Sequence, residues 1–355
     1  MNNPKISIVI PFFNVNIEMF TNCLNSILSQ SYRSFEIIIV NDGSEQKYYD
    51  YLESLKKRDD RILIIHKENG GVSSARNCGT DAAKGDFITY VDADDILHVD
   101  FLKQAIKTIE KYNADFVIGA IKKYDINEIE NVKKISQKTY DDVRFSSYIG
   151  KDISNLVPHL LSSNQFIKFV NGGFINRGPF ARLLKTELAK SMRFPLGVLL
   201  GEDIIWNQKV LKKSNSVIIV ENVWYYYIQN NESAVHKYRK DAVSTVNKTG
   251  IALLDIVNIK NDEIYKAFCS KILADLRSII FQNCWSCKEN TEGIIKKFNC
   301  YLELKHALPW RVLSFRYFRL GNRREKFIYL LYRSNLYFPV FYLYDRITLL
   351  NGRKS

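Results

Sequence analysis

Short apolar runs alternate with amphipathic stretches along the first third of the chain. The apolar runs have the length and the β-branched character of strands. They cover residues 6–10, 35–40, 62–65, 87–91 and 116–121. In the stretches between them, apolar residues recur at the spacing of one helix face, as in Leu24, Ile27 and Leu28. The alternation predicts a doubly wound, mostly parallel α/β sheet. We expect Pro11 to end the first strand, because proline has no N–H for a sheet ladder.

Polar loops follow four of the predicted strands. They cover residues 11–14, 42–44, 69–71 and 92–95. Parallel strands bring such loops to one edge of the sheet, where they can converge on one ligand. The first strand is not followed by G-x-G-x-x-G, and the chain has no G-x-x-x-x-G-K-[ST]. These absences disfavour a dinucleotide-binding dehydrogenase and a P-loop hydrolase. A nucleotide could instead be held by Asp42, with its phosphates carried by a metal ion at Asp94.

Three carboxylates are crowded into four positions directly after the fourth predicted strand: Asp92, Asp94 and Asp95. Carboxylates this close repel one another unless a cation lies among them. Mg²⁺ and Mn²⁺ favour oxygen ligands and commonly share them with substrate phosphates. The alternative is that Asp94 or Asp95 caps the next helix. The cluster alone leaves both interpretations open.

Four motifs together resemble one known family. They are Phe12-Phe13-Asn14, Val40-Asn41-Asp42-Gly43-Ser44, the segment from Asn69-Gly70-Gly71 to Gly79, and Tyr90-Val91-Asp92-Ala93-Asp94-Asp95. In this order and spacing they resemble the inverting glycosyltransferases of family 2, which have the GT-A fold. The resemblance is strong over residues 5–122 and looser to about residue 230. It implies a GT-A sheet, a nucleotide-sugar donor and a divalent cation.

The resemblance also implies roles for single residues. Pro11, Phe13 and Asp42 would line the nucleoside pocket, with Asp42 accepting a hydrogen bond from the base. Asn69 and Arg76 would lie near the nucleotide and its diphosphate, and Arg76 could also orient the carboxylates. For Arg76 the alternative is an ordinary solvated helix position.

For the acidic cluster, the resemblance implies that Asp92 approaches the ribose or the metal. Asp94 would be the principal ligand of Mn²⁺ or Mg²⁺, and Asp95 would support the cluster or cap a helix. UDP is the nucleotide that the family favours. His236 lies in a segment resembling the family's loop that returns to the diphosphate, so it is either a metal or phosphate contact or a structural histidine.

A second acidic pair, Glu202-Asp203, follows Gly201 and opens a predicted helix. The helix dipole favours acids in this position, so capping alone would explain the pair. The resemblance instead assigns Asp203 as the general base that deprotonates the acceptor hydroxyl. Glu202 would then position hydroxyl groups of the acceptor or donor.

The predicted organisation is a GT-A domain over residues 1–235 and a helical region over 236–355. The domain would consist of a nucleotide half, 1–122, and an acceptor half, 123–235, in which 126–178 has only weak periodicity. The net charge of the chain is +13, and residues 301–355 hold eleven Lys or Arg against three Asp or Glu. These basic residues are interleaved with aromatic ones.

Basic-aromatic helices of this kind bind anionic membrane surfaces. The same composition suits single-stranded nucleic acid, which the catalytic half disfavours. The alternative to membrane binding, which stays open, is that these helices pack against the rest of the protein or form a homo-oligomer.

The whole-chain composition is that of a globular protein: 46% of its 355 residues are hydrophobic and 25% are charged. No apolar run approaches the roughly 18–20 residues of a membrane span, and the first residues lack the pattern of a signal peptide. We therefore expect a cytoplasmic protein, peripheral at the inner face of the plasma membrane, with six reduced cysteines. Cys284 and Cys287 form a lone C-x-x-C, which favours a structural pair over a zinc site.

The sequence thus predicts metal-dependent, inverting transfer of a sugar from a UDP-sugar to a glycan acceptor. The acceptor would be linked to a polyprenyl diphosphate and used for capsule, another surface polysaccharide or a glycoconjugate. The alternatives are a protein-linked or wall-polymer acceptor, or a non-catalytic nucleotide-binding partner in an assembly. The presence of both Asp94 and Asp203 argues against the non-catalytic alternative.

Overall fold

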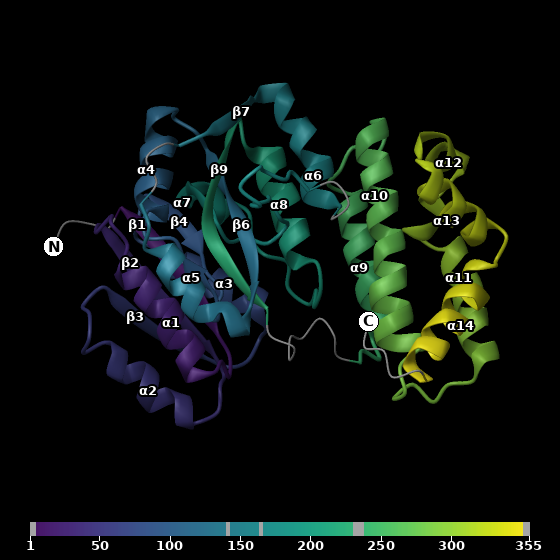
Figure 1. Cartoon of the computed structure of the whole chain (residues 1–355), viewed down its shortest axis with the longest axis horizontal. Helices are drawn as coiled ribbons and strands as arrows, with labels where there is room; N and C mark the ends of the chain where they lie inside the picture. Colours follow the sequence, from purple (N-terminus) through teal and green to yellow (C-terminus); the bar gives the residue numbers. More distant parts are fainter. Residues whose placement is uncertain (1–4, 140–142, 163–165, 230–237, 351–355) are drawn as a thin grey trace. The chain divides into compact units, whose positions relative to one another are not determined.

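The computed structural model describes residues 5–139, 143–162, 166–229 and 238–350. The chain forms two compact units, an α/β unit and a helical unit (Figure 1). The α/β unit comprises residues up to 160 with 166–197 and 202–231, and the helical unit comprises 161–165, 198–201 and 232–355.

The α/β unit is built on a nine-stranded sheet in the order β3-β2-β1-β4-β8-β6-β9-β5, with β7 also paired to β9. Its strands are β1 (Ile6–Phe12), β2 (Phe35–Asp42), β3 (Ile62–Lys67), β4 (Phe87–Tyr90), β5 (Ile96–Leu97), β6 (Phe116–Asp125), β7 (Phe145–Ile149), β8 (Arg182–Lys185) and β9 (Ser216–Gln229). The pairs among β1–β4 and the β6–β9 pair are parallel, whereas β8 runs antiparallel between β4 and β6. The predicted α/β class is therefore confirmed. The sheet has more strands than the five predicted runs, because β8 lies between β4 and β6 and β9 pairs with β6 on its other side.

Pro11 does not end the first strand, and this prediction is wrong: β1 continues to Phe12, and Pro11 pairs with Val40 of β2. Val91 donates its N–H to the carbonyl of Val9, so the backbone groups of Val9 face β4. Because the direction of backbone groups repeats every two residues along a strand, the backbone groups of Pro11 also face β4. The ladder with β4 stops at the pair Val9–Tyr90, so the missing N–H of Pro11 removes no ladder hydrogen bond.

Helices cover both faces of this sheet (Figure 1). Phe20 and Leu24 of α1 and Leu52 of α2 belong to one buried cluster, and Ala75 of α3 and Trp206 of α8 belong to another. The helices of this unit are α1 (Ile17–Leu28), α2 (Lys47–Leu55), α3 (Val72–Ala82), α4 (Phe101–Lys111), α5 (Ile129–Ser136), α6 (Val157–Leu161), α7 (Thr186–Ser191) and α8 (Glu202–Lys213).

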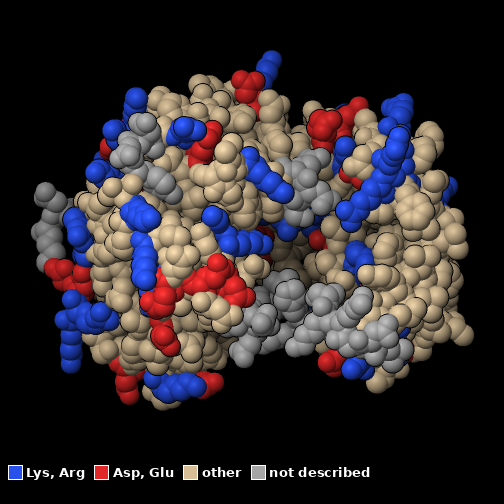
Figure 2. Space-filling model, viewed as in Figure 1, with Lys and Arg blue, Asp and Glu red and all other residues tan. Residues whose placement is uncertain are grey.

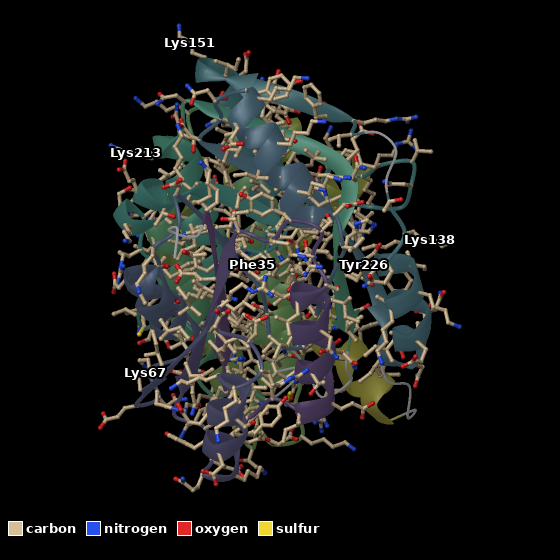
Figure 3. All side chains as sticks on the ribbon, turned by 90° about the vertical axis from the view of Figure 1, so that its left-hand side faces the viewer. Phe35, Lys67, Lys138, Lys151, Lys213 and Tyr226 are labelled. Atoms are coloured by element: carbon tan, nitrogen blue, oxygen red, sulfur yellow. The ribbon has the colours of Figure 1, made fainter. Side chains whose placement is uncertain are left out.

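The carboxyl ends of the parallel strands carry the predicted polar loops. Figure 3 marks Phe35 at the start of β2 and Lys67 at the end of β3, and the register pairs Lys67 with Asp42. This arrangement confirms that the loops share one edge of the sheet, as parallel strands require.

The helical unit has an aromatic core. Its elements are α9 (Ala242–Leu254), α10 (Asp262–Asp275), the π-helical segment η5 (Leu276–Trp285), α11 (Ile294–His306), α12 (Phe315–Leu320), α13 (Arg323–Arg333) and α14 (Tyr337–Leu350). Trp285, Tyr301, Tyr332, Tyr337 and Phe338 are buried and contact one another through their rings. The predicted helical region is confirmed, and many of its aromatic side chains pack internally.

No helix among the described residues is long and apolar enough to span a bilayer. All six cysteines are free thiols, as predicted. Lys and Arg side chains are visible on the faces of both units (Figure 2), so the basic residues are not confined to the helical unit.

Candidate active site

The acidic turn, residues 92–95, is fixed to β9. One carboxylate oxygen of the buried Asp95 accepts a hydrogen bond from the Tyr225 hydroxyl at 2.6 Å, and the other accepts from the Ile228 N–H at 2.8 Å. The same hydroxyl accepts from the N–H of Asp92 at 3.1 Å. Asp95 therefore holds the turn in place and leaves Asp92 and Asp94 at the surface of the site.

Neither Asp94 nor Asp95 caps a helix, so the capping alternative for this cluster is wrong. The residues that follow form the short strand β5, and α4 begins only at Phe101, with Asp100 at its N-cap.

The acidic turn is crowded with negative charge. Burial, together with the charge of Asp92, raises the pKa of Asp94 to about 6. Burial and the charges of Asp94 and Asp92 also raise the pKa of Asp95 well above its usual range. A divalent cation would relieve this repulsion.

The donor groups on this turn suit Mg²⁺ or Mn²⁺. Among the residues that the structure describes, no three His, Cys, Asp or Glu side chains form a complete metal cage. Such ions are, however, commonly held by one or two carboxylates together with substrate phosphates, a role that Asp94 and Asp92 fit. His236, the third predicted ligand, lies outside the described residues.

Arg76 of α3 connects this turn to the start of α8. Its guanidinium is 2.9 Å from the Asp92 carboxylate and 3.3 Å from the Glu202 carboxylate, and it lies over the Phe194 ring. Only 4% of Arg76 is exposed, so the solvated alternative for this residue is wrong. Arg76 brings together two acidic segments that are more than a hundred residues apart in the sequence.

The second acidic segment begins α8 at Glu202. Burial and the charge of Asp203 raise the pKa of Glu202 to about 7, although Arg76 opposes this change. Asp203 accepts a hydrogen bond from the N–H of Ile204 at 2.7 Å. Glu202 and Asp203 are both half-buried, so each remains accessible to a ligand.

Arg182 of β8 is buried beside this segment. Its guanidinium donates to the carbonyls of Phe180 and Asn176 at 2.6 and 2.7 Å. Burial lowers the pKa of Arg182 to about 9, while the negative charge of Asp203 acts in the opposite direction.

Asp42 and Asn69 meet at the other side of the same sheet edge. The Asp42 carboxylate accepts from Lys67 at 2.6 Å and from the N–H groups of Gly70 and Gly71 at 3.0 and 2.7 Å. The Asn69 amide donates to the Asp42 carbonyl at 2.8 Å. The loop between β3 and α3 is thereby tied to the end of β2.

Two further predicted residues lie at the end of β1. Pro11 is half-buried within β1, and Phe13, which follows that strand, is 51% exposed. Gly43 has a φ of +75°, and a Cβ atom there would lie 2.7 Å from the Asn69 nitrogen, so this close approach requires glycine.

Sequence reasoning missed Lys67, Tyr225 and Arg182. Lys67 could have been found, because it pairs with Asp42 in the parallel register of the predicted second and third strands. Tyr225 and Arg182 come from distant strands whose pairing no local pattern predicts.

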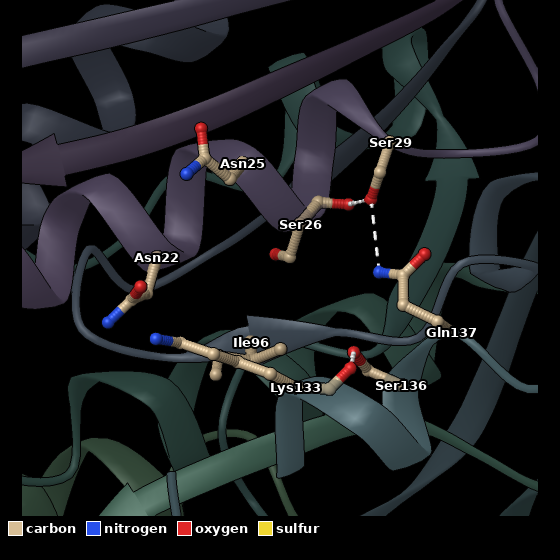
Figure 4. Close-up of a pocket in the computed structure, with 8 residues that line it drawn as sticks. All are labelled: Asn22, Asn25, Ser26, Ser29, Ile96, Lys133, Ser136 and Gln137. Atoms are coloured by element: carbon tan, nitrogen blue, oxygen red, sulfur yellow. Dashed lines mark hydrogen bonds between the residues drawn. The ribbon is translucent and has the colours of Figure 1, made fainter. Parts of the chain in front are cut away.

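A separate polar pocket of about 310 Å³ lies between α1, β5 and α5 (Figure 4). Gln137 donates to the Ser29 hydroxyl across it at 3.4 Å. The pocket is lined by Asn22, Asn25, Ser26, Ser29, Ile96, Lys133, Ser136 and Gln137. None of the predicted site residues lines it.

The fold places the chain in the GT-A class. It superposes on TarS of S. aureus in complex with UDP-GlcNAc with a TM-score of 0.65 and 18% identity, over 99% of this chain and 93% of that one. The mannosyltransferase PcManGT of Pyrobaculum calidifontis, in complex with GDP-Man and Mn²⁺, matches with a TM-score of 0.51 and 13% identity over 100% and 89% of the two chains.

Sequence comparison identifies the family. Residues 7–168 match the model of glycosyl transferase family 2. EpsH of Bacillus subtilis is 39% identical over 259 residues, which are 72% of this chain and 68% of EpsH. GlyA of Streptococcus pneumoniae, a glycosyltransferase, is 34% identical over 63% of this chain, which spans only 30% of GlyA. The chain belongs to glycosyltransferase family 2, and the resemblance of its motifs to that family is confirmed.

Proposed function

We propose that this chain transfers a sugar from a UDP-sugar to a hydroxyl group of a glycan acceptor, with inversion at the anomeric carbon. The observation that carries this proposal is the bridge formed by Arg76 between Asp92 and Glu202. It brings a turn suited to a metal-bound diphosphate to the helix start that bears the candidate base. A single displacement needs these two functions on either side of the reacting carbon.

In this mechanism Asp203 accepts the proton of the acceptor hydroxyl as that oxygen bonds to the anomeric carbon. The bond from that carbon to the diphosphate breaks, and the diphosphate leaves with the electron pair. Mn²⁺ or Mg²⁺ held by Asp94 and Asp92 would neutralise the charge of the leaving diphosphate. Glu202 orients hydroxyl groups beside the base, and Arg76 holds Glu202 and Asp92 at a fixed separation.

Pro11, Phe13, Asp42 and Asn69 form the proposed nucleoside pocket. Within the described ranges, one Asp42 oxygen accepts two hydrogen bonds and the other accepts one. Because each carboxylate oxygen can accept about two hydrogen bonds, the second oxygen keeps one acceptor direction for an N–H of the base. The UDP-GlcNAc bound by TarS supports uracil, and the GDP-Man bound by PcManGT makes guanine the alternative to test.

The test is calorimetric titration of UDP, GDP and dTDP, each with and without Mn²⁺, into the wild type and Asp94→Asn. We expect UDP to bind most tightly, with Mn²⁺ strengthening its binding only when Asp94 is present. If no nucleotide shows metal-dependent binding, the proposal fails and the non-catalytic assembly partner becomes the better interpretation.

We further propose that the acceptor is a lipid-linked glycan for surface polysaccharide or glycoconjugate synthesis, and that the helical unit binds the anionic inner face of the membrane. On α14, the exposed apolar residues Val340, Leu343, Tyr344 and Ile347 lie on one helix face. On α13, the exposed Phe327 and Leu330 are interleaved with basic residues. Exposed apolar side chains next to cations suit an anionic lipid surface.

Vesicle sedimentation with phosphatidylglycerol tests this part of the proposal. A variant with Ser at Val340, Leu343 and Ile347 should lose vesicle binding. Leu196→Ser, which removes an equally exposed apolar side chain from the α/β unit, should keep it. Equal binding by both variants would refute membrane docking through α14.

A further inference from the structure

Lys123 and Arg177 lie over aromatic rings that contact one another, and together with Phe166, Phe174 and Tyr227 they form a cationic cluster. The ammonium of Lys123, in β6, is 5.9 Å from the centre of the Phe174 ring and 5.6 Å from that of Tyr227. The guanidinium of Arg177 is 5.7 Å from the centre of the Phe166 ring. Phe166 and Phe174 stack on each other at 5.6 Å, so one continuous aromatic surface carries both charges.

Backbone pairing holds this cluster at the edge of the sheet that bears the site. Lys123 pairs with Tyr227 in the β6–β9 register. Phe174, in the segment that precedes β8, exchanges backbone hydrogen bonds of 2.9 and 3.0 Å with Ile121 of β6. Both partners of the Lys123 ammonium are therefore fixed by the sheet.

The cluster reaches both acidic segments of the candidate active site. Phe180 stacks on Tyr227 at 6.1 Å and on Tyr225 at 4.5 Å, and the Tyr225 hydroxyl contacts the acidic turn. The Asn207 amide donates to the Arg177 carbonyl at 2.5 Å and to the Asp203 carbonyl at 2.9 Å. The cluster is thus linked to Tyr225 through Phe180 and to Asn207 directly, and these two residues also contact the acidic turn and the backbone of the proposed base.

These charges are not balanced within the described part of the chain. Neither Lys123 nor Arg177 forms an ion pair there with Asp or Glu. Lys123 is exposed over much of its length, but desolvation of its ammonium by the surrounding protein, followed by the charge of Arg177, lowers its pKa. Two like charges held together are unfavourable unless an anion lies between them.

We propose that Lys123 and Arg177 bind a phosphate group carried by the sugar acceptor, while the aromatic surface of Phe166 and Phe174 contacts the acceptor's apolar sugar face. The inference rests on the proposed glycosyl transfer and specifies its acceptor class, a phosphorylated glycan. Arg177 can bind a phosphate through two N–H groups and Lys123 acts as a point charge beside it.

The order of the strands separates this anion site from the donor. The proposed nucleoside residues lie at or just after the ends of β1, β2 and β3, on one side of β4. Lys123 lies on β6, on the other side of β4 and beyond β8. The acidic turn that follows β4 lies between the two groups. A donor that extends from Asp42 to Asp94 therefore leaves Lys123 and Arg177 to the incoming acceptor.

The experiment measures binding of glucose 1-phosphate, with glucose as the neutral counterpart, to the full chain saturated with UDP and Mn²⁺. Ligand-observed NMR gives both affinities. The variants are Lys123→Met and Arg177→Met. Lys122→Met is the matched control, because it removes the same charge from the adjacent strand residue, whose side chain points to the opposite face. UDP affinity is measured for each variant.

We expect the wild type and Lys122→Met to bind glucose 1-phosphate and to bind glucose at least tenfold more weakly. Lys123→Met and Arg177→Met should each weaken binding of the sugar phosphate by about tenfold, the loss expected for one charged hydrogen bond. UDP affinity and binding to phosphatidylglycerol vesicles should not change.

Four results would overturn the inference. Equal losses in Lys122→Met and Lys123→Met would indicate a non-specific charge effect. A loss of UDP affinity in Lys123→Met would assign the cations to the donor, and a loss of vesicle binding would assign them to lipid headgroups. Absence of sugar-phosphate binding by a protein that still binds UDP would refute the inference alone, whereas absence of UDP binding would refute the proposed transfer itself.

Discussion

Asp42, the last residue of β2, and Asp94, which follows β4, lie at the same edge of the sheet, but they differ in how their charge is balanced. Asp42 accepts hydrogen bonds from Lys67 and from two backbone N–H groups. Asp94 lies beside Asp92, and burial raises its pKa to about 6. Asp42 has a cationic partner inside the protein, whereas the neighbouring charge at Asp94 is the like charge of Asp92.

The difference assigns separate tasks to residues that look alike in the sequence. A carboxylate already bonded to ammonium and amide groups can hold a loop in the shape that a ligand needs. A half-buried carboxylate crowded by another is the better place for a cation. The start of α8 combines both situations, because Glu202 forms an ion pair with Arg76, whereas the half-buried Asp203 accepts a backbone hydrogen bond from Ile204.

The largest effect should come from Asp203→Asn, which removes the proposed base and leaves the balanced carboxylates intact. We expect the transfer rate to fall about 10³-fold, within the usual range for general-base catalysis, while UDP affinity changes less than about twofold. Single-turnover assays and calorimetry measure the two quantities. Asp262→Asn, another acid in the first turn of a helix, should be active at the wild-type rate. Near-normal turnover of Asp203→Asn would exclude it as the base.

The bridge between the two acidic segments is tested by Arg76→Met. Asp92 and Glu202 would then lose their buried counter-charge, and we expect a decrease of about 3 kcal/mol in the free energy of unfolding. Urea denaturation measures this change. The control is Arg193→Met, which breaks the exposed pair with Asp81 and should cost less than about 1 kcal/mol. Equal losses in the two variants would mean that Arg76 does not hold the site together.

The balanced side of the comparison is tested by Asp42→Asn. An amide keeps the shape but cannot neutralise Lys67, and its NH₂ group opposes one of the backbone donors. We expect the free energy of unfolding to fall by about 2 kcal/mol and UDP affinity to fall, without loss of the Mn²⁺ dependence that we propose for Asp94. Urea denaturation and calorimetry check both effects. Glu53→Gln, in an exposed pair with Lys56, should be nearly neutral. Loss of the Mn²⁺ dependence in Asp42→Asn would contradict the division of tasks between the two carboxylates.

Local patterns were sufficient for five of the strands in the first 122 residues, for the helices between them and for the motifs that follow them, but not for the two-residue strand β5. In this region each strand is a compact apolar run and each loop lies next to it in the sequence. The same reasoning failed at Pro11, because whether a missing N–H matters depends on the length of the neighbouring strand β4.

The remaining features depend on contacts between distant segments. The link of Arg76 to Glu202, the anchoring of Asp95 by Tyr225 and the insertion of β8 between β4 and β6 each join residues that no local period relates. The burial of Tyr301 and Tyr337 in the helical unit could not be predicted either. A basic-aromatic composition does not distinguish rings in the core from rings at the surface.

The smallest effect concerns Glu202, which is intermediate between Asp42 and Asp94 in how its charge is balanced. Arg76 balances the charge of Glu202 only in part. The pKa of Glu202 in the folded chain is about 7, against an ordinary value of 4.5. Between these values the folded chain binds more protons than the unfolded chain, so stability should decrease as the pH rises. In Glu202→Gln this titration is absent, and we expect the decrease between pH 5 and pH 7.5 to be smaller by an amount on the order of 1 kcal/mol. Urea denaturation at both pH values gives the difference. Parallel pH profiles for the two proteins would show that Arg76 fully neutralises Glu202, which would place Glu202 with Asp42 among the balanced carboxylates.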